Sequence, residues 1–232
     1  MIKALIDAWH SGRVMSRMYG ELLDMLEAAQ NMFRIVGEVI FDGRDPDEVR
    51  EEIYQTDRVI NRAERRIRKE IVEHLAIHPR GDMPAGLVLM SLLKDAERLG
   101  DYCKNLFEIR ELAGAAFPMD ELARRIRERH AEACALFNKV QSALKDANED
   151  LAHAIMADEK HVAGMIEKSV REVAASDLTA RDAVCRALCL RHLKRIHAHL
   201  TNITSAVVQP AHRIDFRRKG KLPKADVPEK EQ

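Results

Sequence analysis

The sequence predicts an all-α protein of six amphipathic helices, arranged as two tandem three-helix bundles. Apolar residues recur at helical spacing along most of the chain, aromatic residues make up only 4% of it, and its two halves match each other. Apolar residues contribute 46% and charged residues 33%. This composition is typical of long helices with one buried and one solvated face.

The first predicted helix shows the pattern most clearly. From Met15 to Val39, apolar residues recur at alternating spacings of three and four, which places them on one helical face. We interpret the methionines of this face as flexible core side chains. The segment Phe41–Asp45 interrupts the pattern and is expected to end the helix.

The second helix is predicted to begin at Asp45-Pro46. Asp45 can cap the free amides of the first turn, and Pro46 fits the first helical position. The helix is expected to end near the segment His78–Gly81, where Pro79 and Gly81 oppose continuation. The third helix is predicted from about Pro84 to Gly114.

Phe117-Pro118 marks the midpoint of the chain, and three further helices are predicted beyond it. Apolar residues at helical spacing predict one helix from about Leu122 to Leu144 and another that continues through Val162. The last helix is expected to begin at the capping segment Ser176–Thr179 and to run to about Val208.

An internal repeat relates the two halves. An offset of 102 residues aligns the second helix with the fifth, and places Asp57 on Glu159. An offset of 97 aligns the third helix with the sixth, and places Asn105 on Asn202. We attribute the difference between the offsets to a longer loop around residues 80–84 in the first half. Two related three-helix units that share one extended core are therefore expected.

These units set the predicted domain boundaries. The first three-helix repeat is assigned to residues 1–116, and the second to residues 117–210. The remaining residues 211–232 are charged and contain proline, and we predict a flexible tail there. The role of the basic stretch within this tail stays open.

Composition also limits the classes of partner. The 38 basic and 38 acidic residues cancel, which argues against a general nucleic-acid or acidic-membrane binder. No apolar run approaches the roughly 18 residues of a transmembrane helix, and the N-terminus lacks signal-peptide features. The four cysteines form no CxxC pair and suggest reduced core thiols. A cytoplasmic location is therefore expected.

Four polar residues on the second and third helices are the candidate metal ligands. Asp57 and Asn61 are four residues apart, as are Glu97 and Asp101, so each pair projects from one helical face. Converging carboxylate and amide oxygens can neutralise a hard or borderline cation and replace its water. The alternative is that these carboxylates form salt bridges with nearby basic residues, namely Arg58, Arg62, Lys94 and Arg98. Gly100, in mid-helix, suggests close approach of another helix or of a bound ion.

The same residues carry a resemblance to a known family. The segment Glu97–Asp101 (Glu-Arg-Leu-Gly-Asp), followed by Asn105, resembles the signature of the PhoU proteins. The stretch Asp57–Glu64 is similar to the motif of the preceding helix in that family. The helix order, the duplication and the length agree as well, and the resemblance spans about residues 10 to 208.

The resemblance implies two three-helix bundles in a cytosolic protein that is often a homodimer. It implies that Asp57, Asn61, Glu97 and Asp101 bind a metal ion, iron or zinc above all. It also implies a regulator that restrains phosphate uptake and the phosphate-sensing histidine kinase. This regulator would act through contacts with a phosphate transporter subunit or with the kinase.

The second half departs from the family pattern at the aligned positions. Where the first half has Asp57, Asn61, Glu97, Gly100 and Asp101, the second has Glu159, Ala163, Lys194, His197 and Ala198. Because two carboxylates are lost and one position is cationic, we do not expect a family-type metal site there. A different site built from histidines stays open, with His161, His192, His197 and His199 as its candidates.

The sequence contains none of the motifs we associate with catalysis: no nucleophile elbow, no phosphate-cradling glycine loop and no His-Glu-x-x-His. We therefore predict a regulator that acts by binding and is not an enzyme. Two alternatives stay open. One is a metal-free accessory scaffold of another anion transporter, and the other is a carboxylate-bridged metal-binding or metalloenzyme bundle.

Overall fold

The computed structural model describes residues 13–209 and Ile214, without the side chains of residues 13 and 79–81. These residues form six helices and no strand. The helices are α2 (Arg13–Phe41), α3 (Pro46–Ile77), α4 (Pro79–Ala113), α5 (Glu121–Lys145), α6 (Glu149–Ala174) and α7 (Ala180–Val208). The predicted all-α class and helix order are confirmed. The predicted tail at 211–232 lies outside the described residues except for Ile214, which is buried.

Side-chain caps fix where several helices begin. The Asp45 carboxylate accepts a hydrogen bond from the Asp47 amide at 2.9 Å, and Pro46 occupies the first position of α3. Thr179 Oγ1 accepts from the Asp182 amide at 3.2 Å at the start of α7. Both caps agree with the sequence expectation, because each oxygen satisfies an amide that has no partner within its helix.

The connection between α3 and α4 differs from the prediction. Only His78 separates the two helices, and α4 begins at Pro79 instead of near Pro84. Proline is well tolerated at the first helical position, where its missing amide hydrogen leaves no bond unmade. The offset difference between the repeats therefore does not come from a loop: α3 and α4 contain 32 and 35 residues, against 26 and 29 in α6 and α7.

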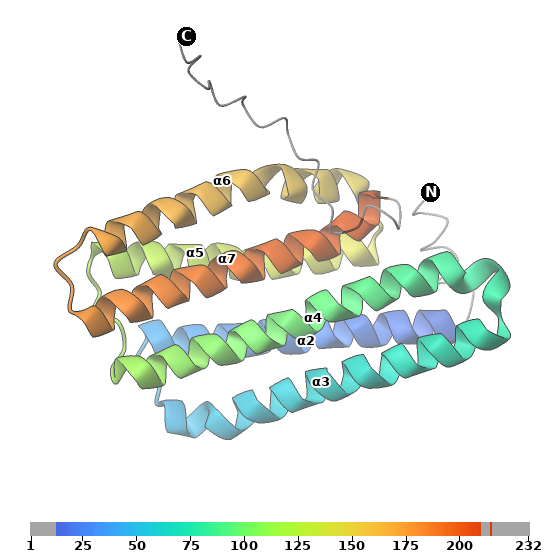
Figure 1. Ribbon diagram of the computed structural model, residues 1–232, viewed down its shortest axis with the longest axis horizontal. Helices are drawn as coiled ribbons and strands as arrows, with labels where there is room; N and C mark the ends of the chain where they lie inside the picture. The colour runs from blue at the N-terminus through green and yellow to red at the C-terminus, as the bar shows by residue number, and fades with distance from the viewer. Residues whose placement is uncertain (1–12, 210–213, 215–232) are drawn as a thin grey trace, which may run out of the picture.

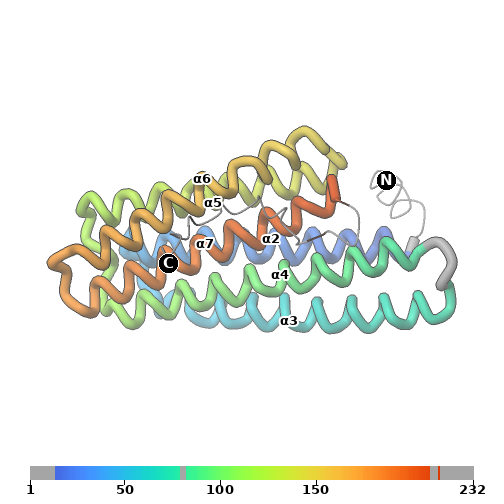
Figure 2. Tube along the Cα trace, turned by 45° about the horizontal axis from the view of Figure 1, so that its top comes forward, coloured from blue at the N-terminus to red at the C-terminus, as the bar shows by residue number. Residues whose placement is uncertain are grey.

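The six helices form two three-helix groups that lie side by side. Figure 1 shows α2–α4 in the lower group and α5–α7 in the upper one, with α4 and α7 adjacent and antiparallel at the junction. The turned view keeps this arrangement (Figure 2). Helix α4 packs against α2, α3 and α7, and α7 packs against α4, α5 and α6. These two helices therefore form the centre of the molecule.

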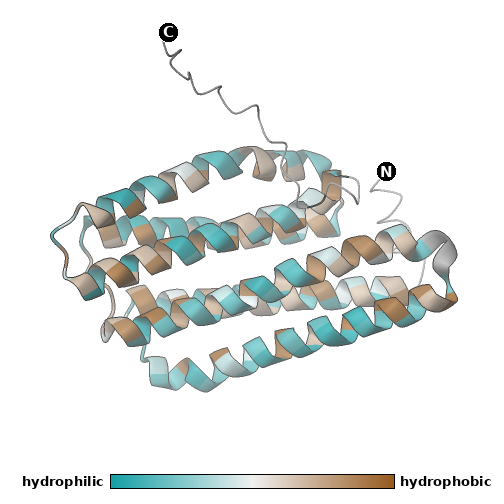
Figure 3. Cartoon of the chain, viewed as in Figure 1, coloured by the Kyte–Doolittle hydropathy of each residue, from teal (hydrophilic) through white to brown (hydrophobic). Residues whose placement is uncertain are grey.

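One buried cluster of apolar residues runs through both groups. Hydrophilic and hydrophobic residues alternate along every helix (Figure 3), as expected for amphipathic helices. On the side of α2 and α5, Tyr19 donates a hydrogen bond to the Leu144 carbonyl at 2.9 Å, and His130 Nε2 donates to the Phe33 carbonyl at 3.0 Å. The two groups thus share a core instead of standing apart as domains.

A buried arginine near the start of α7 binds the residue that precedes α5. Arg186 on α7 is only 1% exposed, and its guanidinium donates to both carboxylate oxygens of Asp120 at 2.7 and 2.6 Å. Asp120 also caps α5 through the Ala123 amide at 2.8 Å. The guanidinium lies over the Phe117 ring, 5.6 Å from its centroid. This contact connects the start of α5, the linker before it and α7.

The cysteines are free thiols, as expected. Cys103, Cys185 and Cys189 are buried and Cys134 is partly buried. Burial raises the pKa of Cys189 to about 12 and that of Cys134 to about 11, so both stay protonated and unreactive near neutral pH. Among the helices of the described residues, none is both long enough and apolar enough to cross a lipid bilayer.

Candidate functional site

The four candidate ligands lie together between α3 and α4, in the first repeat. Asp57 and Asn61 come from α3, and Glu97 and Asp101 come from α4. Asp57 is buried at 7% exposure, and the side chains of Glu97 and Asp101 are 13% and 27% exposed. The spacing of four residues therefore does place each pair on the face that meets the other helix.

Lys104, one turn after Asp101, completes this arrangement. Its Nζ donates to Asp57 Oδ2 at 2.9 Å and lies 3.7 Å from Asp101 Oδ1. Asn61 Nδ2 also donates to Asp57 Oδ2, at 3.3 Å. The ammonium thus lies where an α3 carboxylate and an α4 carboxylate converge. Lys104 was not predicted from the sequence, although its position three residues after Asp101 on the same helix was a usable signal.

Two other basic residues form ion pairs with the α4 carboxylates of the site. Lys94 Nζ donates to Glu97 at 2.8 Å, and Arg98 lies 3.8 Å from Glu97 and 3.4 Å from Asp101. The expected salt bridges are thus present for Lys94 and Arg98. Arg58 contacts Glu51 and Gln55 instead, because it projects from another side of α3.

Electrostatic coupling links the site across both helices. Burial, together with the charges of Glu97 and Asp57, raises the pKa of Asp101 above its ordinary value of 3.8, although Lys104 and Arg98 oppose this shift. Burial alone would lower the pKa of Lys104, but its hydrogen bond to Asp57 and the nearby carboxylates raise it above 10.5. Lys104 therefore remains an ammonium at neutral pH and balances part of the acidic cluster.

The predicted metal ligands do not form a metal-binding cage in this arrangement. Among the described residues, no group of three or more His, Cys, Asp or Glu side chains is disposed to hold an ion. The Lys104 ammonium takes the central position between the Asp57 and Asp101 oxygens. A metal ion could use these oxygens only by displacing Lys104, and metal binding by the four residues stays a prediction.

Gly100 has a packing explanation. A Cβ at this position would lie 3.1 Å from Cδ1 of Ile60 on α3. Contacts this short are tighter than ordinary van der Waals packing, so the glycine allows α3 and α4 to approach each other. Of the two explanations raised by the sequence, close approach of a helix is the one this contact supports.

The second repeat holds the aligned residues at the equivalent place. A cleft of about 20 Å³ between α6 and α7 is lined by Glu159, Ala163, Ile166, Lys194, His197 and Ala198. Five of these six are the aligned counterparts of the first-repeat site and its glycine. Lys194 reaches across to pair with Glu167 on α6. The same location between helices thus holds three carboxylates in the first repeat, whereas in the second it holds Glu159 beside Lys194 and His197.

Two of the four candidate histidines lie instead at the junction of the repeats. His199 Nδ1 donates to Asp95 Oδ1 at 2.5 Å, and its ring stacks on Tyr102 with centroids 5.5 Å apart. His192 lies 5.6 Å from the same tyrosine ring. The offset of 97 maps Asp95 onto His192 and Tyr102 onto His199, so α4 and α7 make these contacts in a nearly symmetric way. This cluster was not predictable from the sequence, because it depends on how α4 and α7 pack.

The chain is similar in sequence to a known domain family and to two proteins of other organisms. Residues 22–109 match the family model of the PhoU domain. The chain is 28% identical over 201 residues to an uncharacterized protein of Deinococcus radiodurans, covering 82% of this chain and 85% of that protein. It is 23% identical over 214 residues to the phosphate-specific transport system accessory protein PhoU homolog of Synechocystis, covering 84% and 88%.

Solved structures agree in fold. The crystal structure of PhoU from Pseudomonas aeruginosa superposes with a TM-score of 0.76 at 19% identity, over 86% of this chain and 97% of that one. The phosphate transport system regulatory protein PhoU from Streptococcus pneumoniae gives a TM-score of 0.72 at 16% identity, over 83% and 92%. The likeness thus extends over both repeats.

Proposed function

We propose that this chain is a PhoU-type regulator of phosphate uptake and phosphate signalling, which acts by binding other proteins in the cytoplasm. The match of residues 22–109 to the PhoU domain model and the likeness in fold to PhoU structures over both helix groups support this proposal. Its partners in this proposal are a phosphate transporter subunit or a sensor histidine kinase. The observation that carries the proposal is the match of both repeats to PhoU structures, together with a relative named as a phosphate transport accessory protein.

The chemistry of the site supports binding in preference to catalysis. The carboxylates between α3 and α4 are neutralised by Lys94, Arg98 and Lys104. Such a balanced, partly exposed set of charges can fix the orientation of a protein partner, since complementary charges contribute mainly to specificity and association rate.

The acidic site also supports a more specific proposal. If Asp57, Asn61, Glu97 and Asp101 bind iron or zinc, the ion competes with the Lys104 ammonium for the same oxygens. Carboxylate and amide oxygens of this kind suit a hard or borderline cation. The residues of the second repeat are left out of this proposal, since Lys194 and Ala198 replace two of the acids there.

Direct binding to candidate partners tests the proposed function. The purified chain would be immobilised and exposed to the cytoplasmic phosphate transporter subunit and to the cytoplasmic part of the sensor kinase from the same organism, with an unrelated transporter subunit as control. We expect saturable binding to at least one phosphate-related partner and none to the control. Absence of binding to both would contradict the proposal.

A further inference from the structure

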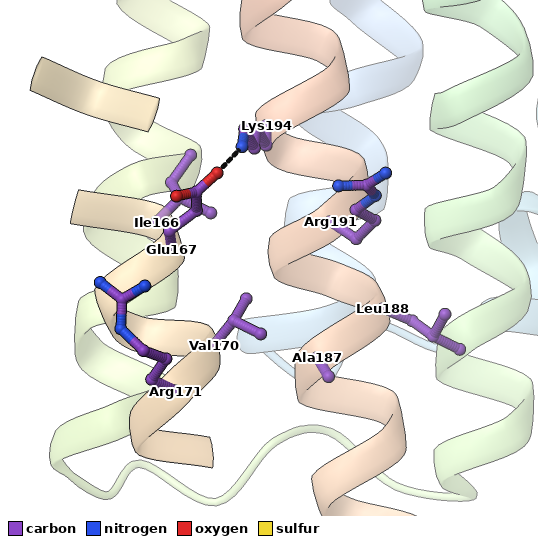
Figure 4. Close-up of a pocket in the computed structure, with 8 residues that line it drawn as sticks. All are labelled: Ile166, Glu167, Val170, Arg171, Ala187, Leu188, Arg191 and Lys194. Carbon is purple, nitrogen blue, oxygen red and sulfur yellow. Dashed lines mark hydrogen bonds and ion pairs between the residues drawn. The ribbon is translucent and has the colours of Figure 1, made fainter. Parts of the chain in front are cut away.

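A groove of about 370 Å³ lies between α6 and α7 in the second repeat (Figure 4). Its apolar lining consists of Ile166 and Val170 from α6 with Ala187 and Leu188 from α7. Leu188 extends from the side of α7 that faces away from α6 (Figure 4). Ile166 is buried at 2% exposure, whereas Leu188 is 38% exposed. Val184, one turn before Leu188 on α7, is 51% exposed. The groove thus leads into a small apolar surface along α7 that water contacts directly.

The rim of this groove is mainly basic. Lys194 forms an ion pair across the groove with Glu167, shown by the dashed line in Figure 4. The hydrogen bond from Lys194 and its charge lower the pKa of Glu167, and the charges of Arg171 and Arg191 contribute to the same shift. Arg171 on α6 and Arg191 on α7 also line the groove. Within the described part of the chain, neither guanidinium has a direct hydrogen bond or ion pair, although both act on Glu167 through their charge.

The first repeat shows that the apolar lining is particular to the second one. The offset of 102 places Glu64 and Arg68 at the positions of Ile166 and Val170. Glu64 and Arg68 form an ion pair at 2.9 Å along α3. Where the first repeat has a charged, internally paired surface, the second therefore has an apolar lining.

We propose that the groove between α6 and α7 binds an acidic, amphipathic segment of a partner protein, whose apolar side chains contact the apolar lining and whose carboxylates pair with Arg171 and Arg191. This inference rests on the proposed function and names the surface and the partner chemistry. Charge complementarity carries it: the lining presents two unpaired guanidinium groups beside apolar side chains. Guanidinium groups favour carboxylates because their geometry allows bidentate pairing.

The shape of the groove also favours a polypeptide segment. Its lining spans about two turns of each helix, from Ile166 to Arg171 and from Ala187 to Lys194, and Val184 extends the apolar surface further along α7. An amphipathic segment that anchors apolar side chains at helical or extended spacing matches such an elongated surface.

Photo-crosslinking in cells tests the proposal directly. p-Benzoylphenylalanine would replace Leu188 in the full chain, and in a matched variant it would replace Val59, which is 51% exposed on α3. We expect an ultraviolet-induced adduct from position 188 whose mapped peptide has apolar residues flanked by at least two carboxylates. Position 59 should not give this adduct. An adduct at 188 with a basic segment or with lipid, or no more adduct than at 59, would overturn the proposal.

Reversing the charge of the two arginines tests whether they bind the partner's carboxylates. In the crosslinking chain, Arg171→Glu/Arg191→Glu should reduce the adduct at least tenfold. The matched double variant Lys69→Glu/Lys139→Glu makes the same change of charge on exposed parts of α3 and α5 and should leave the adduct unchanged. Thermal unfolding of both variants checks that the fold is retained, which is expected because all four side chains are exposed. An adduct insensitive to Arg171→Glu/Arg191→Glu contradicts the groove assignment.

The two proposals fail in different ways. If the parent chain binds neither the phosphate transporter subunit nor the sensor kinase, the proposed function fails. A charge-sensitive adduct from position 188 to an acidic segment of some other protein would still support the groove. If the parent binds one of these partners and Arg171→Glu/Arg191→Glu binds it equally well, only the groove assignment fails.

Discussion

Lys104 holds the central position of the acidic site. Its ammonium bridges from α4 to Asp57 on α3, 2.9 Å away, and lies 3.7 Å from Asp101. A lysine side chain can therefore supply the positive charge that the carboxylates need, without a metal ion. This geometry favours the metal-free accessory scaffold that the sequence left open as an alternative. Basic residues of the chain itself balance the charges of the carboxylates.

Replacing this lysine should increase the affinity for a divalent cation. Lys104→Met removes the ammonium while keeping a side chain of similar length. A hydrogen bond to a charged group contributes about 1.5–3 kcal/mol, and about 1.4 kcal/mol corresponds to a tenfold change in affinity. We therefore expect Lys104→Met to bind Zn²⁺ at least tenfold more tightly than the parent, measured by titration calorimetry of metal-free protein.

Two further variants serve as controls for the Zn²⁺ titration. Adding Glu97→Ala/Asp101→Ala to Lys104→Met should abolish the increase in Zn²⁺ affinity. Lys139→Met on α5, made in the parent chain, should leave the Zn²⁺ affinity unchanged. If Lys104→Met binds Zn²⁺ no better than the parent does, the ion and the ammonium do not share a site.

At the scale of elements, Arg186 is the contact that holds the start of α5 against α7. Its bidentate pair with Asp120 also orients the cap of α5. Arg186→Met should lower the free energy of unfolding by about 2–4 kcal/mol, because it removes a charge-assisted pair and a cation–π contact from a buried position. Urea unfolding measures the change, with Arg124→Met, at an exposed position of α5, as the control. A loss no larger than the control's would contradict this role.

The same pair makes a prediction about acid stability. The Arg186 guanidinium lowers the pKa of Asp120 below its ordinary value of 3.8. A carboxyl whose pKa is depressed in the folded state stabilises the fold above its unfolded pKa, and this contribution is lost as the pH falls through the folded pKa. The stability of the parent should thus fall more steeply below pH 3.8 than that of Arg186→Met.

Some helix boundaries could be predicted from the sequence and others could not. The caps at Asp45 and Thr179 were predictable, because a short polar side chain before an apolar-periodic segment satisfies free amides locally. The segment His78–Gly81 was wrongly expected to interrupt the helices for longer. Pro79 can either break a helix or begin one, and only the packing of α4 against its neighbours decides between these outcomes.

The candidate site was predictable in part for a related reason. Spacing within a helix placed Asp57 with Asn61, which are hydrogen-bonded, and Glu97 with Asp101, whose charges interact. It could not place the Lys104 ammonium, whose position depends on side-chain rotamers and on the distance between α3 and α4. Contacts between repeats, such as Asp95 with His199, also depend on tertiary packing and were not predicted.

For the whole molecule, two three-helix groups with different side-chain chemistry share one core. Helices α4 and α7 pack at the junction, and α7 also forms one side of the groove and of the smaller cleft that it shares with α6. The first repeat presents carboxylates balanced by Lys104, and the second presents apolar and basic side chains. A protein built in this way offers two surfaces of different chemistry on one rigid scaffold, which suits a regulator that contacts other proteins.

Phosphate uptake in cells of the source organism tests the proposed regulation most directly. Initial rates of radiolabelled phosphate uptake would be measured in phosphate-replete medium for the parent strain, a strain lacking this chain, and that strain complemented with the chain. We predict faster uptake without the chain and restoration of the parental rate by complementation, because the regulator restrains uptake. Equal rates in all three strains would contradict the proposal that this chain regulates phosphate uptake.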